Sequence, residues 1–352
     1  MSDLAQFLPW QASLAASWLS QRERFAHAWL IHGLPGIGKR QFALAAAASL
    51  LCESPLQGLA CGHCAACLWL ASGNHPDLRR IRPEAVALEE GAAAGGAEDD
   101  GEAAASAAKK APSKDIRVEQ LRVLSPWFNT ATHRGGWRVA VLYPAQAMNS
   151  ISANALLKVL EEPPEHTVFL LVADAPDRLL PTLVSRCRRL PLPVPGKPES
   201  LAWLEAQGVA EAGQWLAAAG GAPLLAMQLA QTGASPCPEW LNQLVAPLAR
   251  AQAPDIGQLA DHLEKMPADV WIDALQRLFL DLLLAASGAP VRYFPSLEKQ
   301  TRLAARHAAM ASLADTAKWL AQQRAVAGHP LNAKLLVHST LQRVAMACRP
   351  AS

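Results

Sequence analysis

One glycine-rich segment restricts the fold of this chain more than any other feature of its sequence. Residues 33–39 read Gly-Leu-Pro-Gly-Ile-Gly-Lys and lie between the apolar run Ala28–His32 and the Ala- and Leu-rich segment Gln41–Leu51. A strand, a glycine-rich turn and a helix in succession are the context of a phosphate-binding P-loop. A glycine-rich turn without a ligand is the alternative. The candidate phosphate-binding residues are Gly33, Gly36, Gly38 and Lys39.

Further along the chain, apolar runs alternate with helical patterns. Strands are predicted at Trp137–Tyr143 and Thr167–Ala173, with a helix over Ser152–Glu162 between them that ends before Pro163. A strand-like segment follows at Arg188–Leu192. The alternation predicts an α/β domain with a parallel sheet.

The P-loop lacks the residues that hold a catalytic metal. Arg40 follows Lys39, where a Ser or Thr would be a magnesium ligand, and no carboxylate lies in Tyr143–Gln146 after the next predicted strand. No catalytic magnesium is therefore expected. Binding of ATP or ADP stays open, because the phosphate-binding glycines and the lysine are present.

Four of the seven cysteines form a C-x8-C-x2-C-x2-C set. Such spacing lets four thiolates converge on one tetrahedral zinc ion and leaves no open position for catalysis. His63 and His75 are nearby alternative ligands, and an iron–sulphur cluster would use similar thiolates. The candidate metal ligands are Cys52, Cys61, Cys64 and Cys67.

Composition and charge narrow the class of protein. Hydrophobic residues make up 51% of the 352 residues, which predicts a packed globular chain, and the net charge of +2 predicts no general basic field for nucleic acid. The longest apolar runs, Phe42–Leu51 and Leu278–Ser287, are too short to cross a membrane. The N-terminus lacks the pattern of a secretory signal, so a cytoplasmic protein is expected.

The rest of the chain divides by composition. Residues 84–114 are rich in Ala, Gly and Ser and predict a largely disordered insertion. Prolines at 193, 195 and 198 mark a linker. Within the helical remainder, Trp271 begins an apolar stripe with Leu275, Leu278 and Leu282 that predicts an ordinary helix-bundle core. The predicted helices are 199–231, 238–250, 255–266, 268–286, 296–327 and 331–347.

The order of these motifs resembles the clamp-loader subunits of bacterial DNA polymerase III, which belong to the AAA+ family. The resemblance rests on the P-loop, the cysteine segment, the run Ala153–Pro164 (Ala-Asn-Ala-Leu-Leu-Lys-Val-Leu-Glu-Glu-Pro-Pro) and Ser185-Arg186-Cys187. It covers residues 1 to about 230 and extends more loosely beyond. The motor subunits, gamma and tau, keep a P-loop threonine and a strand-end Asp-Glu pair. Because this chain has neither, it is similar to a member that does not hydrolyse ATP.

The resemblance implies an architecture and a role for one arginine. It implies an AAA+ ATPase-like α/β domain over residues 1–191, with an inserted zinc module at 52–67 and the insertion at 84–114. A small helical lid domain over 192–236 and an all-α collar domain over 237–352 would follow, the collar joining the subunits in a ring. Arg186 would act in trans as an arginine finger in the ATP site of a neighbouring motor subunit, stabilising charge in the transition state.

The implied partners are the gamma or tau and delta subunits, with the sliding clamp and primer-template DNA contacted through the complex. The chain would be a component of the DNA polymerase III holoenzyme without ATPase or polymerase activity of its own. Two alternatives are a catalytically active gamma- or tau-like ATPase subunit and a zinc-dependent DNA-binding protein. Against the second, residues 52–67 contain no Lys or Arg.

Overall fold

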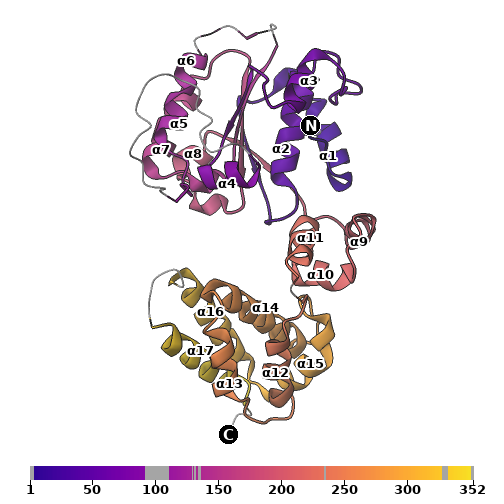
Figure 1. Ribbon diagram of the computed structural model, residues 1–352, viewed down its shortest axis with the longest axis vertical. Coiled ribbons are helices and arrows are strands. Elements are labelled where there is room, and N and C mark those ends of the chain that lie inside the picture. The colour runs from indigo at the N-terminus through magenta and orange to yellow at the C-terminus, as the bar shows by residue number, and fades with distance from the viewer. Residues whose placement is uncertain are drawn as a thin grey trace. The chain divides into compact units, whose positions relative to one another are not determined.

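The computed structural model describes residues 4–91, 111–128, 130, 132–133, 136–233, 235–326 and 332–349 (Figure 1). The chain divides into two compact units, Met1–Val194 and Pro195–Ser352. The sequence predicted a first domain that ends at residue 191. No helix in the described part of the chain combines the length and the apolar character that crossing a bilayer requires.

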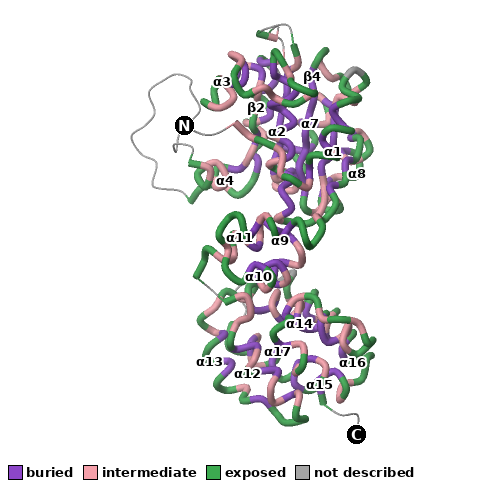
Figure 2. Tube along the Cα trace, turned by 90° about the vertical axis from the view of Figure 1, so that its right-hand side faces the viewer, coloured by how far each residue is buried: buried purple, intermediate pink, exposed green. Residues whose placement is uncertain are grey.

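A five-stranded parallel sheet forms the centre of the first unit, which confirms the predicted α/β class. The strand order is β2-β3-β4-β1-β5, and β1 pairs with β4 so that Ala28 lies opposite Phe169. All residues of β3 and β4 are buried, because helices cover both faces of the sheet (Figure 2). The strands are β1 Ala28–His32, β2 Leu78–Ile81, β3 Arg138–Leu142, β4 Thr167–Ala173 and β5 Arg188–Pro191.

The sequence did not predict β2. This strand reads Leu-Arg-Arg-Ile and lies at one edge of the sheet, where Arg79 and Arg80 need not be buried. The opposite edge strand, β5, carries Arg188 and Arg189 in the same way. An edge strand with charged residues lacks the continuous apolar pattern by which buried strands are recognised.

Helices α1–α3 lie on one face of the sheet and α5–α8 on the other (Figure 1). Helix α7 begins two residues before its predicted start, since the Asn149 side chain accepts a hydrogen bond from the Ser152 amide and caps the helix. The helices of this unit are α1 Ala12–Leu19, α2 Lys39–Leu51, α3 Ala65–Ala71, α4 Glu84–Glu89, α5 Val118–Arg122, α6 Leu124–Phe128, α7 Ser150–Glu161 and α8 Pro181–Val184.

The predicted disordered insertion at 84–114 was wrong at its beginning. Glu84–Glu89 form helix α4. The Glu84 carboxylate accepts a hydrogen bond from the Ser113 amide at 3.0 Å and lies 3.0 Å from the Arg117 guanidinium. These contacts hold the two ends of the segment together. Residues 92–110 lie outside the described residues.

The second unit is helical, as the sequence predicted, but two of the predicted helices are interrupted. Segment 199–231 divides into three helices at turns that contain Gly208 and Gly220, both with positive φ. Segment 296–327 divides at Ala308, which is extended. The helices are α9 Lys197–Ala206, α10 Ala212–Ala218, α11 Pro223–Gln231, α12 Glu239–Leu248, α13 Ile256–Leu263, α14 Ala268–Ala286, α15 Glu298–His307, α16 Met310–Val326 and α17 Ala333–Ala347.

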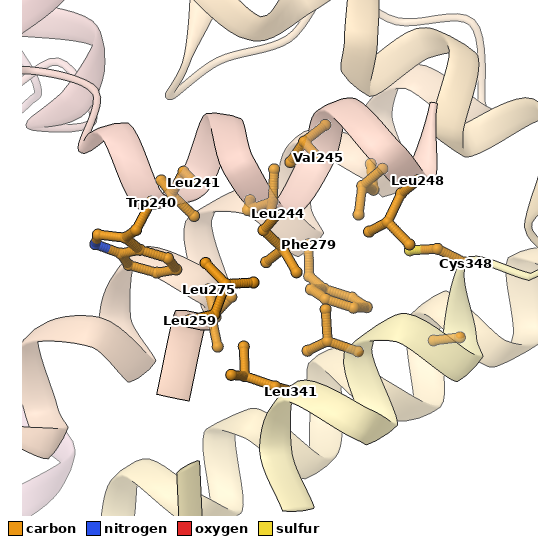
Figure 3. Close-up of a cluster of buried hydrophobic side chains, with 14 of the residues drawn as sticks. Trp240, Leu241, Leu244, Val245, Leu248, Leu259, Leu275, Phe279, Leu341 and Cys348 are labelled. Atoms are coloured by element: carbon orange, nitrogen blue, oxygen red, sulfur yellow. The ribbon is translucent and has the colours of Figure 1, made fainter. Parts of the chain in front are cut away.

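Two separate groups of buried apolar side chains hold this unit together. Helices α9–α11 share a small cluster that includes Leu204 and Trp215. Helices α12–α17 share a larger one, in which Trp240, Phe279 and Leu341 converge (Figure 3). The predicted stripe on α14 belongs to the larger cluster, with each of its four residues at most 1% exposed, so it is core.

Candidate functional site

The glycine-rich segment 33–39 joins β1 to α2, as the sequence predicted. Gly33, Gly36 and Gly38 all have positive φ, which strains residues with side chains. At Gly33 a Cβ atom would also lie 2.7 Å from the Leu192 carbonyl oxygen, so no larger residue fits. The loop therefore needs glycine at these positions, and it follows the carboxyl end of β1.

The lysine of this loop is engaged by its own chain. The Lys39 side chain is 3% exposed, and its Nζ lies 2.5 Å from Oδ1 of Asp174 and donates to the Leu34 carbonyl oxygen at 2.5 Å. Burial lowers the pKa of Lys39, and the Asp174 carboxylate acts in the opposite direction. Asp174 directly follows β4, which neighbours β1. The side chains of Lys39 and Asp174 therefore meet at the carboxyl ends of these two strands.

The side chains of Arg40 and Tyr143 both bind the carboxylate of Glu90. Arg40 donates to Oε1 of Glu90 at 2.9 Å, and the Tyr143 hydroxyl donates to Oε2 at 3.0 Å. The Arg82 Nε also lies 2.9 Å from Oε2, although it is not aligned as a hydrogen bond. Burial, together with the Glu90 charge, raises the pKa of Tyr143 to about 12. One carboxylate of the chain itself therefore holds the side chains of Arg40 and Tyr143.

The end of β3 offers amide groups instead of acids. The Gln146 side chain donates to Asp174 Oδ2 at 3.4 Å and accepts from the Asp174 amide at 3.3 Å. The segment Tyr143–Gln146 carries no carboxylate, as read from the sequence. The acid that follows the neighbouring strand β4, Asp174, is paired with Lys39.

The four predicted metal ligands converge. Their Sγ atoms all lie within 4.8 Å of one another, with 3.9 Å between Cys52 and Cys64 and 3.9 Å between Cys61 and Cys67. Four sulphurs about 2.3 Å from a tetrahedral zinc ion lie about 3.8 Å apart. The donor set and its spacing therefore fit zinc.

Backbone hydrogen bonds and burial act in opposite directions on these thiols, since burial raises the pKa of Cys52 and Cys67 while backbone hydrogen bonds lower that of Cys61. The Cys61 amide donates to the Cys52 sulphur at 3.3 Å, and the Cys64 amide donates to the Cys61 sulphur at 3.4 Å. A further backbone hydrogen bond, from His63, is the main cause that lowers the pKa of Cys61 to about 6. The alternative ligands, His63 and His75, do not belong to the group of described side chains that could share one ion.

Arg186 lies just after α8, within Ser185-Arg186-Cys187. Its Nη1 donates to the Thr182 carbonyl oxygen at 2.9 Å, and its Nη2 lies 2.5 Å from Glu161 Oε1. The arginine side chain is 36% exposed, so part of the guanidinium faces solvent. Cys187 is buried, and burial raises the pKa of its thiol to about 12.

Three acidic residues of the site were missed by the sequence reasoning. Glu161 lies within the motif Ala153–Pro164, and Asp174 immediately follows a predicted strand, so both carried a signal that could have been used. Glu90 carried none, because it belongs to a segment of biased composition. Only the folded chain places it beside Arg40 and Tyr143.

Comparisons with known proteins identify relatives of this chain. The chain is 42% identical over 230 residues to the DNA polymerase III delta-prime subunit of Pseudomonas aeruginosa, covering 64% of this chain and 62% of that relative. It is 33% identical over 184 residues to the delta-prime subunit of Escherichia coli, covering 52% of this chain and 47% of the relative. The matches thus span less than two thirds of those relatives' own lengths.

Among solved structures, a DNA polymerase III gamma subunit-related protein of Thermotoga maritima aligns over 95% of this chain and 99% of that one. The sequence identity is 16% and the TM-score 0.44, a score too low to establish a shared fold. The sequence model of the family described as DNA polymerase III, delta subunit, matches residues 13–195, which is more than half of the chain. The chain therefore belongs to the DNA polymerase III delta-subunit family, and the two relatives named above are delta-prime subunits.

Proposed function

We propose that this chain is a non-hydrolysing subunit of the DNA polymerase III clamp-loader complex. In this role it helps to load the sliding clamp onto primed DNA and supplies Arg186 in trans to the ATP site of a neighbouring subunit. The observation that carries the proposal is the contrast between two sites of one chain. Arg186 is partly exposed, although it also pairs with Glu161, whereas the P-loop lysine, Lys39, is 3% exposed and paired with Asp174.

The state of the P-loop supports the absence of hydrolysis. A phosphate at Lys39 would compete with Asp174, which already holds the ammonium 2.5 Å away. A magnesium ion would meet the guanidinium of Arg40 instead of a hydroxyl ligand. Bound ATP or ADP would therefore act as a structural ligand, and hydrolysis by the isolated chain is not expected.

The remaining parts fit this role. The four cysteines would hold a zinc ion with a closed thiolate shell, which stabilises the surface segment and leaves no position for a substrate. The separate apolar clusters of α9–α11 and α12–α17 support a lid over 192–236 and a collar over 237–352. The collar would join this chain to the gamma or tau and delta subunits.

Neither alternative function is favoured. An autonomous ATPase would need acids at the end of β3, where Tyr143–Gln146 have none. A zinc-dependent DNA-binding protein would need basic residues at the cysteine segment, and 52–67 contains no Lys or Arg.

The test is Arg186→Ala in a complex reconstituted with gamma and delta. ATP hydrolysis stimulated by clamp and primed DNA is measured at verified equal assembly. An arginine finger raises kcat by about 10³- to 10⁵-fold in well-studied GTPases. ATP hydrolysis at the site next to this chain should therefore nearly stop. Arg178→Ala is the matched control, because Arg178 is exposed on the turn just before α8. Unchanged hydrolysis by the Arg186 variant would refute the role in trans.

A further inference from the structure

Glu161 holds a position that helix stability does not explain. It is the last residue of α7, which ends before Pro163. A carboxylate at the C-terminal end of a helix is disfavoured by the partial negative charge of the last carbonyl groups. The contact that offsets this cost at Glu161 is the one with Arg186, whose Nη2 lies 2.5 Å from Oε1.

The guanidinium of Arg186 is held at two points. Besides Glu161, the carbonyl oxygen of Thr182 accepts from Nη1 at 2.9 Å. The two anchors come from different elements, since Glu161 ends α7 and Thr182 belongs to α8, and these helices pack together. Two of the five N–H groups of an arginine are engaged in this way, and three remain to donate to a phosphate.

We propose that Glu161 is a positioning residue for Arg186. This inference rests on the proposed function, because it concerns the same arginine. An unanchored arginine side chain samples many rotamers. It would lose this freedom each time it bound the phosphate in the transition state. Anchoring at Nη1 and Nη2 fixes the direction of the guanidinium beforehand, which is the pre-organisation that stabilises a transition state at least cost.

The expected effect is moderate because the contact is exposed. The side chains of Arg186 and Glu161 are 36% and 50% exposed, and pairs in such positions bias a conformation by up to about fivefold. Glu161→Ala should therefore lower kcat for ATP by about three- to fivefold. KM for ATP should stay unchanged, because the neighbouring subunit binds the nucleotide. Glu161→Gln, which keeps an acceptor oxygen, should lose less than about half of kcat.

The experiment measures steady-state ATP hydrolysis by the reconstituted complex with clamp and primed DNA. Five forms of this chain are compared at equal assembly: wild type, Glu161→Ala, Glu161→Gln, Arg186→Ala and the double variant of Glu161→Ala with Arg186→Ala. Glu162→Ala is the matched control, since Glu162 is the next residue and is also exposed. If Glu161 acts through Arg186, the double variant equals Arg186→Ala, and the two losses do not add.

The outcomes separate this inference from the proposed function. A loss with Arg186→Ala but wild-type kcat with Glu161→Ala would overturn the positioning role and leave the arginine finger in place. A rise in kcat with Glu161→Ala would show that the acid restrains Arg186 and would equally overturn it. An equal loss in Glu161→Ala and Glu162→Ala would indicate a general effect of charge. Unchanged hydrolysis with Arg186→Ala would refute the proposed function and the inference together.

Discussion

Replacing Asp174 with alanine tests whether Lys39 depends on a carboxylate of its own chain. The Lys39 side chain is 3% exposed, and Asp174 is its paired acid. In the variant, the Leu34 carbonyl oxygen is the remaining described acceptor for the buried ammonium. A buried charge without a counter-charge destabilises the folded state, so the unfolding free energy of the first unit should fall.

The size of the loss follows from the burial of each partner. Removing one member of a fully buried ion pair costs about 3–5 kcal/mol. The Asp174 side chain is 42% exposed, so water already screens the pair, and a loss of about 1–3 kcal/mol is expected. Lys39→Met combined with Asp174→Ala should recover most of this loss, because no unpaired charge then stays buried.

The assay is urea-induced unfolding of the full chain, with attention to the transition of the first unit. Asp177→Ala is the matched control, because Asp177 is exposed and lies three residues along the same loop. In addition, inorganic tripolyphosphate should stabilise the Asp174 variant more than the wild type, since an anion can then reach Lys39. The reasoning is refuted if Asp174→Ala unfolds like Asp177→Ala, or if the double variant is no more stable than Asp174→Ala.

Two further predictions concern the tyrosine and the cysteines. The pKa of Tyr143 is raised to about 12, above the ordinary value of about 10. Neutral Tyr143 therefore stabilises the fold below about pH 10, and this contribution is lost as the pH rises from about 10 to about 12. Phenolate absorbance, with Tyr143→Phe as the blank, should show that midpoint, and Glu90→Gln should lower it; an ordinary midpoint in the wild type would contradict the burial argument. Cys64→Ser should lower the zinc content well below one ion per chain and reduce the melting temperature. Metal analysis and thermal unfolding measure both effects, and visible absorbance of an iron–sulphur cluster in the wild type would rule out zinc.

The central strands were predictable because they are buried on both faces. β1 and β4 coincide with the predicted runs. A short, continuous apolar segment bounded by turns is typical of a strand that is buried on both faces. The edge strand β2 was not predictable, because Arg79 and Arg80 interrupt its apolar pattern. These residues are tolerated because the strand lies at the edge of the sheet. The interruption at Gly208 carried a sequence signal, since glycine readily adopts the positive φ of a helix end, whereas the extended Ala308 carried none.

The candidate sites differ in how much the sequence reveals. Ligands that lie close together in the sequence, as in Cys61–Cys67, can be recognised from their spacing, because the local backbone brings them together. Contacts across the sheet edge cannot be recognised in this way. Lys39 and Asp174 are far apart in the chain and meet because β1 and β4 are neighbours.

The sequence by itself determined the glycine-rich loop after a strand, the set of four closely spaced cysteines and the absence of acids at Tyr143–Gln146, since each depends on residue type and short spacing. Only the tertiary structure decided what the charged groups contact. The strand order places Asp174 beside Lys39, the end of α4 brings Glu90 to Arg40, and the packing of α7 on α8 places Glu161 beside Arg186. Electrostatic interactions act over a few ångströms in space and not along the chain, so the fold selects the partners of each charge.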